Sequence, residues 1–143
     1  MALTPVPVAR KALLDSISGP TGAETVPLAQ CAWRVLAAEV KALRTHPPFA
    51  NSAMDGYAVR GDEMAEGVSL DVIGESAAGR AFEGTVGPGQ TVRIFTGAPM
   101  PDGADTILMQ EDADGLDSPT VRVRVPPAKG KFLRAAGLDF REG

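Results

Sequence analysis

The chain has 143 residues, of which 44% are hydrophobic and 22% charged, and its formal net charge is −4 at pH 7. This length suits one domain of ordinary size or two small lobes with a moderate core, and excludes a large multidomain enzyme. The acidic balance gives no reason to expect binding to nucleic acid or to an anionic membrane surface, which requires clustered Lys and Arg. Glycine (16) and proline (12) exceed their usual share, which indicates a folded, turn-rich protein.

The N-terminal part of the chain predicts two helices. Residues 7–18 carry apolar side chains about one turn apart, and Gly19-Pro20 ends the pattern. A second helix is predicted by apolar residues that recur on one face, namely Leu28, Cys31, Ala32, Val35 and Leu36. On this helix Cys31 is expected to be a small core residue. Trp33 lies off the apolar face, so it either covers another lobe or meets a partner chain.

The cysteine and histidine content limits which disulfides and metal sites the chain can form, and it is informative about the cellular location. A single cysteine cannot form an internal disulfide, and no cysteine or histidine cluster offers a zinc site. No apolar run approaches the ~20 residues that span a bilayer, and the N-terminus carries no export signal. We therefore expect a cytoplasmic location. The single histidine, His46, precedes two prolines and has no visible catalytic partner, so we expect it to be structural.

Beyond residue 42 the sequence is typical of β-structure, because short β-branched runs alternate with Gly, Pro and Asp. The predicted strands are residues 57–59, 70–73, 91–95, 106–109 and 120–125. The last of them alternates regularly. This alternation places Val121, Val123 and Val125 in the core and Arg122 and Arg124 outside.

Two segments exceed what an ordinary β domain needs. The first is PPFANSAMDGYAV, residues 47–59, in which Asp55-Gly56 favours a tight type I′ hairpin turn. The second is IFTGAPMPDGADTILMQED, residues 94–112. Together with VPLAQCAWRVLAAEV at 26–40 and RAAGLD at 134–139, they resemble the N-terminal half of the MoeA family, the molybdopterin molybdenumtransferases, which includes the E domain of gephyrin.

Two positions depart from the pattern of that family. Leu138 stands where the family usually has a glutamate, which puts in doubt any carboxylate function there. Trp33 stands where a glycine is common, which suggests a local change in packing.

The resemblance implies an enzymatic reaction of molybdenum cofactor biosynthesis. Molybdenum from molybdate is inserted into adenylylated molybdopterin, AMP is released, and Mg²⁺ is the cofactor. Cleaving such a bond requires positioning and the neutralisation of developing negative charge. Carboxylates that bind Mg²⁺ and small donors that bind oxyanions are suitable residue types.

The resemblance also implies the site residues. The expected catalytic residues are Asp55, Thr96 and Asp139. Asp55 is also a candidate metal ligand, while the other metal and molybdate ligands stay open. The expected substrate contacts are Asn51, Ser52 and Gly97. For Asn51 and Ser52 the alternative is that their side chains only cap the turn, and Gly97 is of interest because a missing side chain lets an anion approach the backbone.

Four acidic residues within the second segment are expected to be structural. Asp102 and Asp105 lie in PDGAD, a stretch typical of turns, and Glu111 and Asp112 fall at the solvated end of a predicted strand.

The order of helices and then strands in the sequence predicts an α+β fold that is mostly β, and the resemblance implies that one lobe is inserted in the other. Residues 1–47 and 131–143, with the two N-terminal helices and the C-terminal strands, are expected to form one incomplete lobe, and residues 48–130 an inserted β-rich lobe. The family's molybdopterin-binding domain and C-terminal β domain are absent from this chain. We therefore expect an N-terminal fragment that is inactive alone.

In the family the enzyme is a homodimer whose active cleft is shared between subunits, so Asp55 and Thr96 are expected to complete a partner's site. A molybdopterin-adenylylating enzyme and molybdoenzyme maturation factors are further candidate partners. One alternative class stays open, a non-catalytic β-rich binding or scaffold module. A free-standing Mg²⁺-dependent phosphohydrolase is disfavoured, because no clustered set of carboxylates is visible in the sequence.

Overall fold

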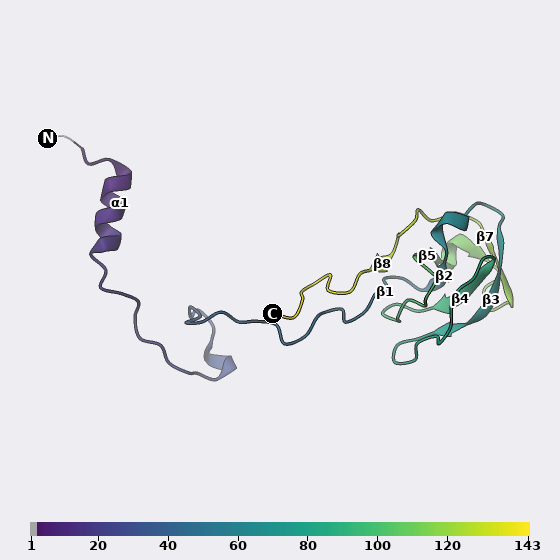
Figure 1. The fold of residues 1–143 in the computed structure, drawn as a ribbon, viewed down its shortest axis with the longest axis horizontal. Coiled ribbons are helices and arrows are strands. Elements are labelled where there is room, and N and C mark those ends of the chain that lie inside the picture. Colours follow the sequence, from purple (N-terminus) through teal and green to yellow (C-terminus); the bar gives the residue numbers. More distant parts are fainter. Residues whose placement is uncertain (1–2) are drawn as a thin grey trace. The chain divides into compact units, whose positions relative to one another are not determined.

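The structure is a computed structural model that describes residues 3–143 (Figure 1). The chain forms two compact units, one that ends at Val40 and one from Lys41 to Gly143. No helix in the described range is both long and apolar enough to cross a membrane.

The helix of the first unit agrees with the sequence pattern. α1 (Val6–Asp15) carries a proline, Pro7, in its first turn, where the missing N–H would have no intrahelical partner. The N–H of Ser16 donates to the carbonyl oxygen of Ala12 and closes the last turn. The first predicted helix is therefore confirmed, and it ends three residues before its predicted end at Ser18.

The second predicted helix is wrong. Only η1 (Leu28–Gln30), a short 3₁₀ turn, forms there. The predicted helix would gain most of its stability by burying its apolar face. Val35 on that face is 96% exposed, so this stabilisation is missing. Cys31, expected in a core, is only half-buried. Trp33 is fully exposed, and its φ of 66° lies in the left-handed region, which a helix does not continue through.

A six-stranded sheet dominates the second unit, in the order β5, β2, β4, β3, β7, β6. The strands are β2 (Gly56–Val59), β3 (Ser69–Ser76), β4 (Gln90–Ile94), β5 (Thr106–Met109), β6 (Ala113–Asp114) and β7 (Thr120–Val123). Neighbours are antiparallel except β3 and β4, which run parallel. The five predicted strands are confirmed with small shifts at their ends, whereas β6 was not predicted.

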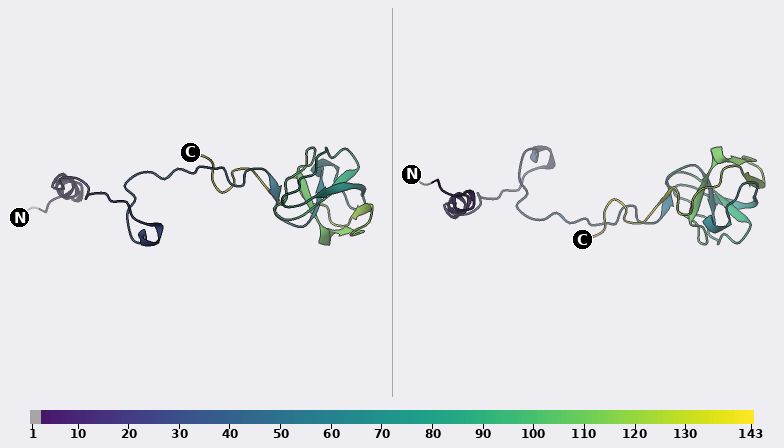
Figure 2. Two further views of the ribbon diagram at one scale, coloured as in Figure 1. Left: turned by 90° about the horizontal axis from the view of Figure 1, so that it is seen from below. Right: turned by 90° about the horizontal axis from the view of Figure 1, so that it is seen from above.

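The sheet curls towards a barrel, and η3 (Gln110–Asp112) connects its two edge strands, β5 and β6 (Figure 2). Alternate side chains of β2 enter different clusters. Tyr57 and Val59 pack with buried residues of β3, β5 and β7, while Ala58 packs with a second cluster around Val92 and Ile94. All four residues of β2 are buried. This strand is therefore covered on both faces and gives a rigid support to the residues at its ends.

One core assignment in β7 is wrong. Val121 and Val123 are buried and Arg122 and Arg124 are exposed, as the alternation predicts. Val125 is 51% exposed, because the strand ends at Val123 before a pair of prolines that cannot donate to the ladder.

Paired valine substitutions test this register. Val123→Ala is expected to lower the free energy of unfolding by about 1–3 kcal/mol, because it removes buried methyl groups. Val125→Ala is the matched control and should change it by less than about 0.5 kcal/mol. Urea denaturation measures both changes. Equal losses of unfolding free energy in the two variants would contradict the end of β7 at Val123.

A short two-stranded ribbon lies beside the sheet. β1 (Asn51–Ser52) pairs antiparallel with β8 (Leu133–Arg134), as Figure 1 shows. The pairing continues towards the chain end, since His46 N donates to the Phe140 carbonyl at 2.9 Å. The segments on either side of the β-rich lobe therefore meet. The division of the chain at residues 47 and 130 stays a prediction.

The predicted hairpin at Asp55-Gly56 is wrong. β1 pairs with β8, and β2 pairs with β4 and β5, so β1 and β2 are not partners. Neither Asp55 nor Gly56 has a positive φ, which a type I′ turn requires. Glycine is needed at position 56 for another reason: a Cβ there would lie 2.1 Å from the carbonyl oxygen of Leu108 in β5.

Candidate functional site

Asp55 and Thr96, 41 positions apart in the sequence, form one hydrogen-bonded pair. The backbone N–H and the hydroxyl of Thr96 both donate to Asp55 Oδ1, each at 2.8 Å. The β2–β4 register explains the meeting, because it sets Gly56 opposite Ile94 and so brings Asp55, directly before β2, close to Thr96, two residues after β4. The structure therefore joins two of the three predicted catalytic residues.

The Asp55 carboxylate is held ionised. The N–H of Thr96 and then its hydroxyl lower the pKa of Asp55; slight desolvation opposes this, and the charge of Arg93 adds a smaller lowering. Within residues 3–143, Asp55 Oδ2 takes part in no hydrogen bond or ion pair. A carboxylate of low pKa is a weak general base near neutral pH. It is well suited to stabilise positive charge or to bind a cation.

The lowered pKa of Asp55 predicts a pH-dependent effect on stability. Asp55→Asn is expected to lower the melting temperature slightly at pH 7, because the residue is exposed and the charge–dipole gain is screened. The ionised form contributes fully above about pH 4, the unfolded range of Asp, and the contribution is lost as pH falls through the folded pKa. The difference in melting temperature between wild type and variant should therefore shrink as the pH falls from about 4 through the folded pKa. A constant difference across this range would contradict the assignment.

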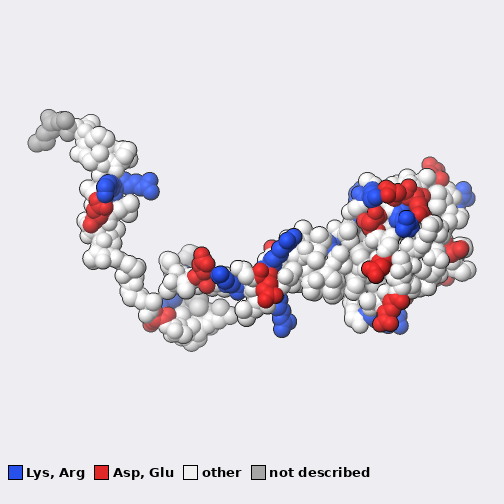
Figure 3. Space-filling model, viewed as in Figure 1, with Lys and Arg blue, Asp and Glu red and all other residues white. Residues whose placement is uncertain are grey.

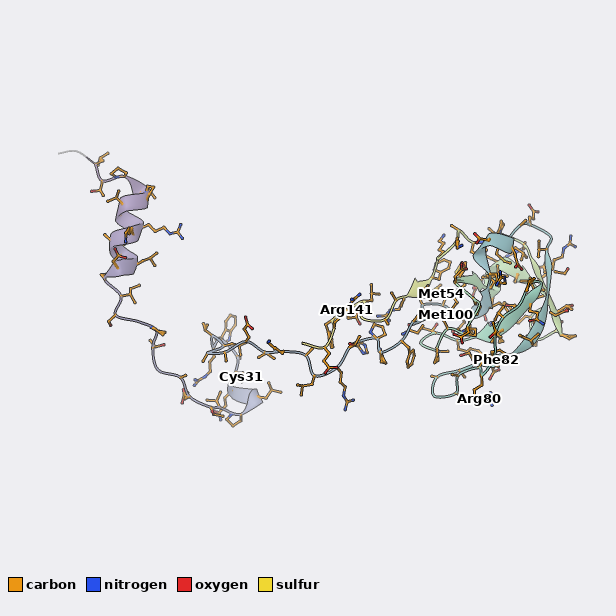
Figure 4. The ribbon with its side chains drawn as sticks, viewed as in Figure 1. Cys31, Met54, Arg80, Phe82, Met100 and Arg141 are labelled. Atoms are coloured by element: carbon orange, nitrogen blue, oxygen red, sulfur yellow. The ribbon has the colours of Figure 1, made fainter. Side chains whose placement is uncertain are left out.

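Ser52 and Gly97, two of the predicted substrate contacts, lie beside the pair. Gly97 N donates to the Ser52 carbonyl at 2.8 Å, and Ser52 N donates to the Ala98 carbonyl at 3.1 Å. The Ser52 hydroxyl donates to the carbonyl of Met54, which Figure 4 labels, and accepts from the Met54 N–H. These bonds match the capping alternative for Ser52. The N–H groups of Thr96 and Gly97 are both used within the chain.

Asn51, the third predicted contact, is 7% exposed. It stands opposite Arg134 in the ribbon and forms a further bridge with Pro99. Its Oδ1 is buried and has no hydrogen-bond partner among the described residues. Asn51 is therefore buried in the ribbon and not exposed as Asp55 and Thr96 are.

The structure does not bring Asp139 to the pair. Its Oδ2 lies 3.4 Å from an Arg134 nitrogen and 3.5 Å from His46 Nε2. Its backbone N–H donates to the His46 carbonyl, and the His46 ring stacks on Phe140 at 5.7 Å. No hydrogen bond or ion pair in the described part of the chain links Asp139 to Asp55 or Thr96. These contacts agree with the structural role expected of His46.

Asp105 is the structural counterpart of Asp55. Its Oδ1 accepts from the Gly61 N–H at 2.7 Å and from the Thr106 hydroxyl at 2.8 Å, and its Oδ2 lies 3.5 Å from Lys129 Nζ. Burial raises the pKa of Asp105, but these three donors together hold it below its ordinary value. Both oxygens are engaged, so Asp105 stabilises a turn, as the sequence predicts.

Acidic and basic side chains lie side by side on the visible face of the β unit (Figure 3). Lys129 pairs with Asp62 at 2.5 Å, and Arg80 pairs with Glu75 at 2.6 Å. These pairs neutralise part of the surface charge of the unit, whereas Asp55 takes part in no ion pair within the described residues.

Sequence reasoning missed Arg93 and Gln110. One Arg93 nitrogen donates to the Gly56 carbonyl at 2.9 Å, and another donates to Gln110 Oε1 at 2.7 Å. A charged residue inside a predicted strand was the available signal. Its partners lie 37 and 17 positions away, and only the strand register brings them together.

The donor set for a metal ion is partial. Within residues 3–143, no three His, Cys, Asp or Glu side chains lie close enough together to hold a metal. Asp55 offers one free carboxylate oxygen. Mg²⁺ is often held by one or two carboxylates together with substrate phosphates and water, so Asp55 fits as one ligand of such a set.

The chain matches, over residues 4–143, the family described as the MoeA N-terminal region (domain I and II). The molybdopterin molybdenumtransferase of Haemophilus influenzae is 35% identical over 135 residues, which cover 94% of this chain and 33% of that protein. The protein of the same name from a Nostoc species is 36% identical over 151 residues, with coverages of 98% and 34%. The chain therefore spans about a third of the length of these relatives.

A solved structure agrees with these sequence relatives. The molybdopterin biosynthesis moeA protein from Pyrococcus horikoshii OT3 superposes with a TM-score of 0.77 at 33% identity, over 99% of this chain and 38% of that chain. The mostly β fold with its curled sheet is thus that of a MoeA protein. By sequence over nearly its whole length and by fold, the chain belongs to the MoeA family and represents its N-terminal region.

Proposed function

We propose that this chain is the N-terminal region of a molybdopterin molybdenumtransferase, and that Asp55 and Thr96 serve its reaction. In that reaction molybdenum from molybdate enters adenylylated molybdopterin, and AMP is released. Relatives at 35% and 36% identity carry the name of this enzyme. The observation that carries the proposal is the Asp55–Thr96 pair, in which an exposed carboxylate is fixed through one oxygen while the other has no partner among the described residues.

Thr96 and Asp55 have separate roles in this proposal. Thr96 uses its N–H and hydroxyl to fix the carboxylate, so its own hydroxyl can only accept a further hydrogen bond. Asp55 uses its free oxygen to orient a positively charged group, which costs no reorganisation during the reaction because the carboxylate is already in place. Mg²⁺, when bound, supplies neutralisation of phosphate charge.

The remainder of the site is proposed to come from outside this chain. Asp55 and Thr96 are exposed and line none of the pockets found among the described residues, whereas a pterin requires a preformed, partly apolar cleft. We place that cleft in the pterin-binding domain of a second subunit of a homodimer. Asp139 stays a candidate for the same shared site. The 143 residues alone are therefore expected to lack transferase activity.

A chimera tests this function. Residues 4–143 replace the matched region of the Haemophilus influenzae relative, and AMP release from adenylylated molybdopterin is measured with molybdate present. The chimera is expected to be active, and the isolated chain to show no activity above background. The unmodified relative is the control for the assay, and circular dichroism confirms folding. A folded but inactive chimera would favour a non-catalytic binding module instead.

A further inference from the structure

Arg93 on β4 is the one charged side chain in a strand of otherwise uncharged residues, and it is half-buried. Its guanidinium lies 5.1 Å from the centre of the Tyr57 ring and 4.8 Å from the centre of the Phe95 ring. Tyr57 is its partner in the antiparallel register, and Phe95 lies two residues further along the chain. Both rings hold the charge by cation–π attraction and restrict its position.

The hydrogen bonds of Arg93 reach the immediate surroundings of the catalytic pair. One bond goes to the carbonyl of Gly56, the residue directly after Asp55. Another goes to the side chain of Gln110, whose backbone N–H donates to the Asp55 carbonyl at 3.2 Å. The ring contact on Phe95 fixes the residue directly before Thr96. One side chain thus holds a neighbour of each member of the pair.

From this geometry we propose that Arg93 is a positioning residue that sets the separation and orientation of Asp55 and Thr96. It does not touch the reacting groups itself. Its action on the reaction rests on the proposed function, whereas its action on the hydrogen bonds of the pair does not.

Lysine cannot replace arginine in this role. The planar guanidinium presents several N–H donors in a fixed fork, and here two of its nitrogens bond to acceptors on different elements. A lysine keeps the positive charge but concentrates its donors on one flexible nitrogen. Arg93→Lys therefore keeps the positive charge but removes the planar fork of N–H donors, whereas Arg93→Gln removes both.

Amide hydrogen exchange of the 143-residue chain is the primary test. The probe is the Thr96 N–H, which donates to Asp55 Oδ1 at 2.8 Å. The Gly61 N–H, which donates to Asp105 Oδ1 at 2.7 Å, is a matched reference in the same molecule. Both Arg93 variants are expected to speed exchange at Thr96 roughly 10-fold or more and to leave Gly61 unchanged. Arg80→Gln, which removes an exposed arginine paired with Glu75, is the control variant (Figure 4).

Each other outcome overturns the proposal. Unchanged exchange at Thr96 would show that Arg93 does not position the pair. Faster exchange at Thr96 in Arg93→Gln but not in Arg93→Lys would show that a positive charge is enough to hold the pair. Equal acceleration at Thr96 and Gly61 would show that the variants destabilise the whole unit. If both Arg93 variants fail to fold, Gln110→Met decides, because it removes one acceptor of the fork and keeps the backbone bond to Asp55. Gln110→Met should accelerate hydrogen exchange at the Thr96 N–H and not at the Gly61 N–H. Unchanged exchange at Thr96 in this variant would contradict the proposal.

The catalytic part is tested in the active chimera. Arg93→Lys is expected to lower kcat roughly 10- to 100-fold, the cost of a small misplacement, while KM changes much less. An unchanged kcat would overturn the catalytic role. If the wild-type chimera itself is inactive, the proposed function fails, and the exchange result at Thr96 still decides whether Arg93 positions the pair.

Discussion

In the chimera, Asp55→Asn is expected to slow molybdenum insertion about 100-fold or more, the usual cost of removing a preorganised electrostatic group. Asparagine has nearly the same shape, and its carbonyl can still accept from Thr96. The substitution therefore removes the outward charge and largely keeps the fold. Single-turnover AMP release measures the effect directly.

Asp105→Asn is the matched control for this substitution. Asp105 also accepts from a backbone N–H and a threonine hydroxyl, but its second oxygen faces Lys129. This change is expected to lower the melting temperature and to leave the rate of the chimera within about twofold, as for most changes outside a site. Equal rate losses in the two variants would show that Asp55 acts only through the fold.

Gly56→Ala is expected to have the largest effect on stability. Its Cβ would lie 2.1 Å from the Leu108 carbonyl oxygen and 3.0 Å from the Met109 Cα, and these backbone atoms of β5 are held in the ladder with β2 and cannot rotate away as a side chain can. The free energy of unfolding should fall by about 3 kcal/mol or more, the upper end of overpacking costs. Urea denaturation at equilibrium measures the loss.

Gly87→Ala is the control for that glycine. A Cβ at position 87 would meet only the end of the Gln90 side chain, at 3.0 Å, which can rotate away with the loss of one hydrogen bond from the Gly87 N–H. The expected change is within about 1 kcal/mol. A Gly56→Ala variant as stable as this control would mean that β2 and β5 do not approach as closely as the structure has them.

The strands could be predicted from the sequence because their signal is local. Alternation over residues 120–123 directly reports which side chains are buried, and the five predicted strands formed. The prediction of the second helix was wrong because an apolar helix face is stable only when it packs against another surface. No such surface in the described part of the chain covers Val35, which is 96% exposed. The two-residue strands β1, β6 and β8 are too short to carry a periodic signal.

The candidate site depended on the resemblance more than on local physics. Asp55-Gly56 by itself favoured a hairpin turn that does not form, and the glycine is needed for close strand approach. That Asp55 meets Thr96 follows from the β2–β4 register, which a single sequence does not contain. Arg93 was missed for the same reason, since its importance lies in the neighbours that the register supplies.

A double-mutant cycle of Asp55→Ala and Thr96→Ala in the chimera tests most directly whether the pair acts as one unit in molybdenum insertion. If Thr96 works by fixing the carboxylate, it has nothing left to fix once Asp55 is gone. The double variant should then be no slower than Asp55→Ala alone, while Thr96→Ala alone should already be clearly impaired. Losses that add in full, or full activity in both single variants, would contradict the account.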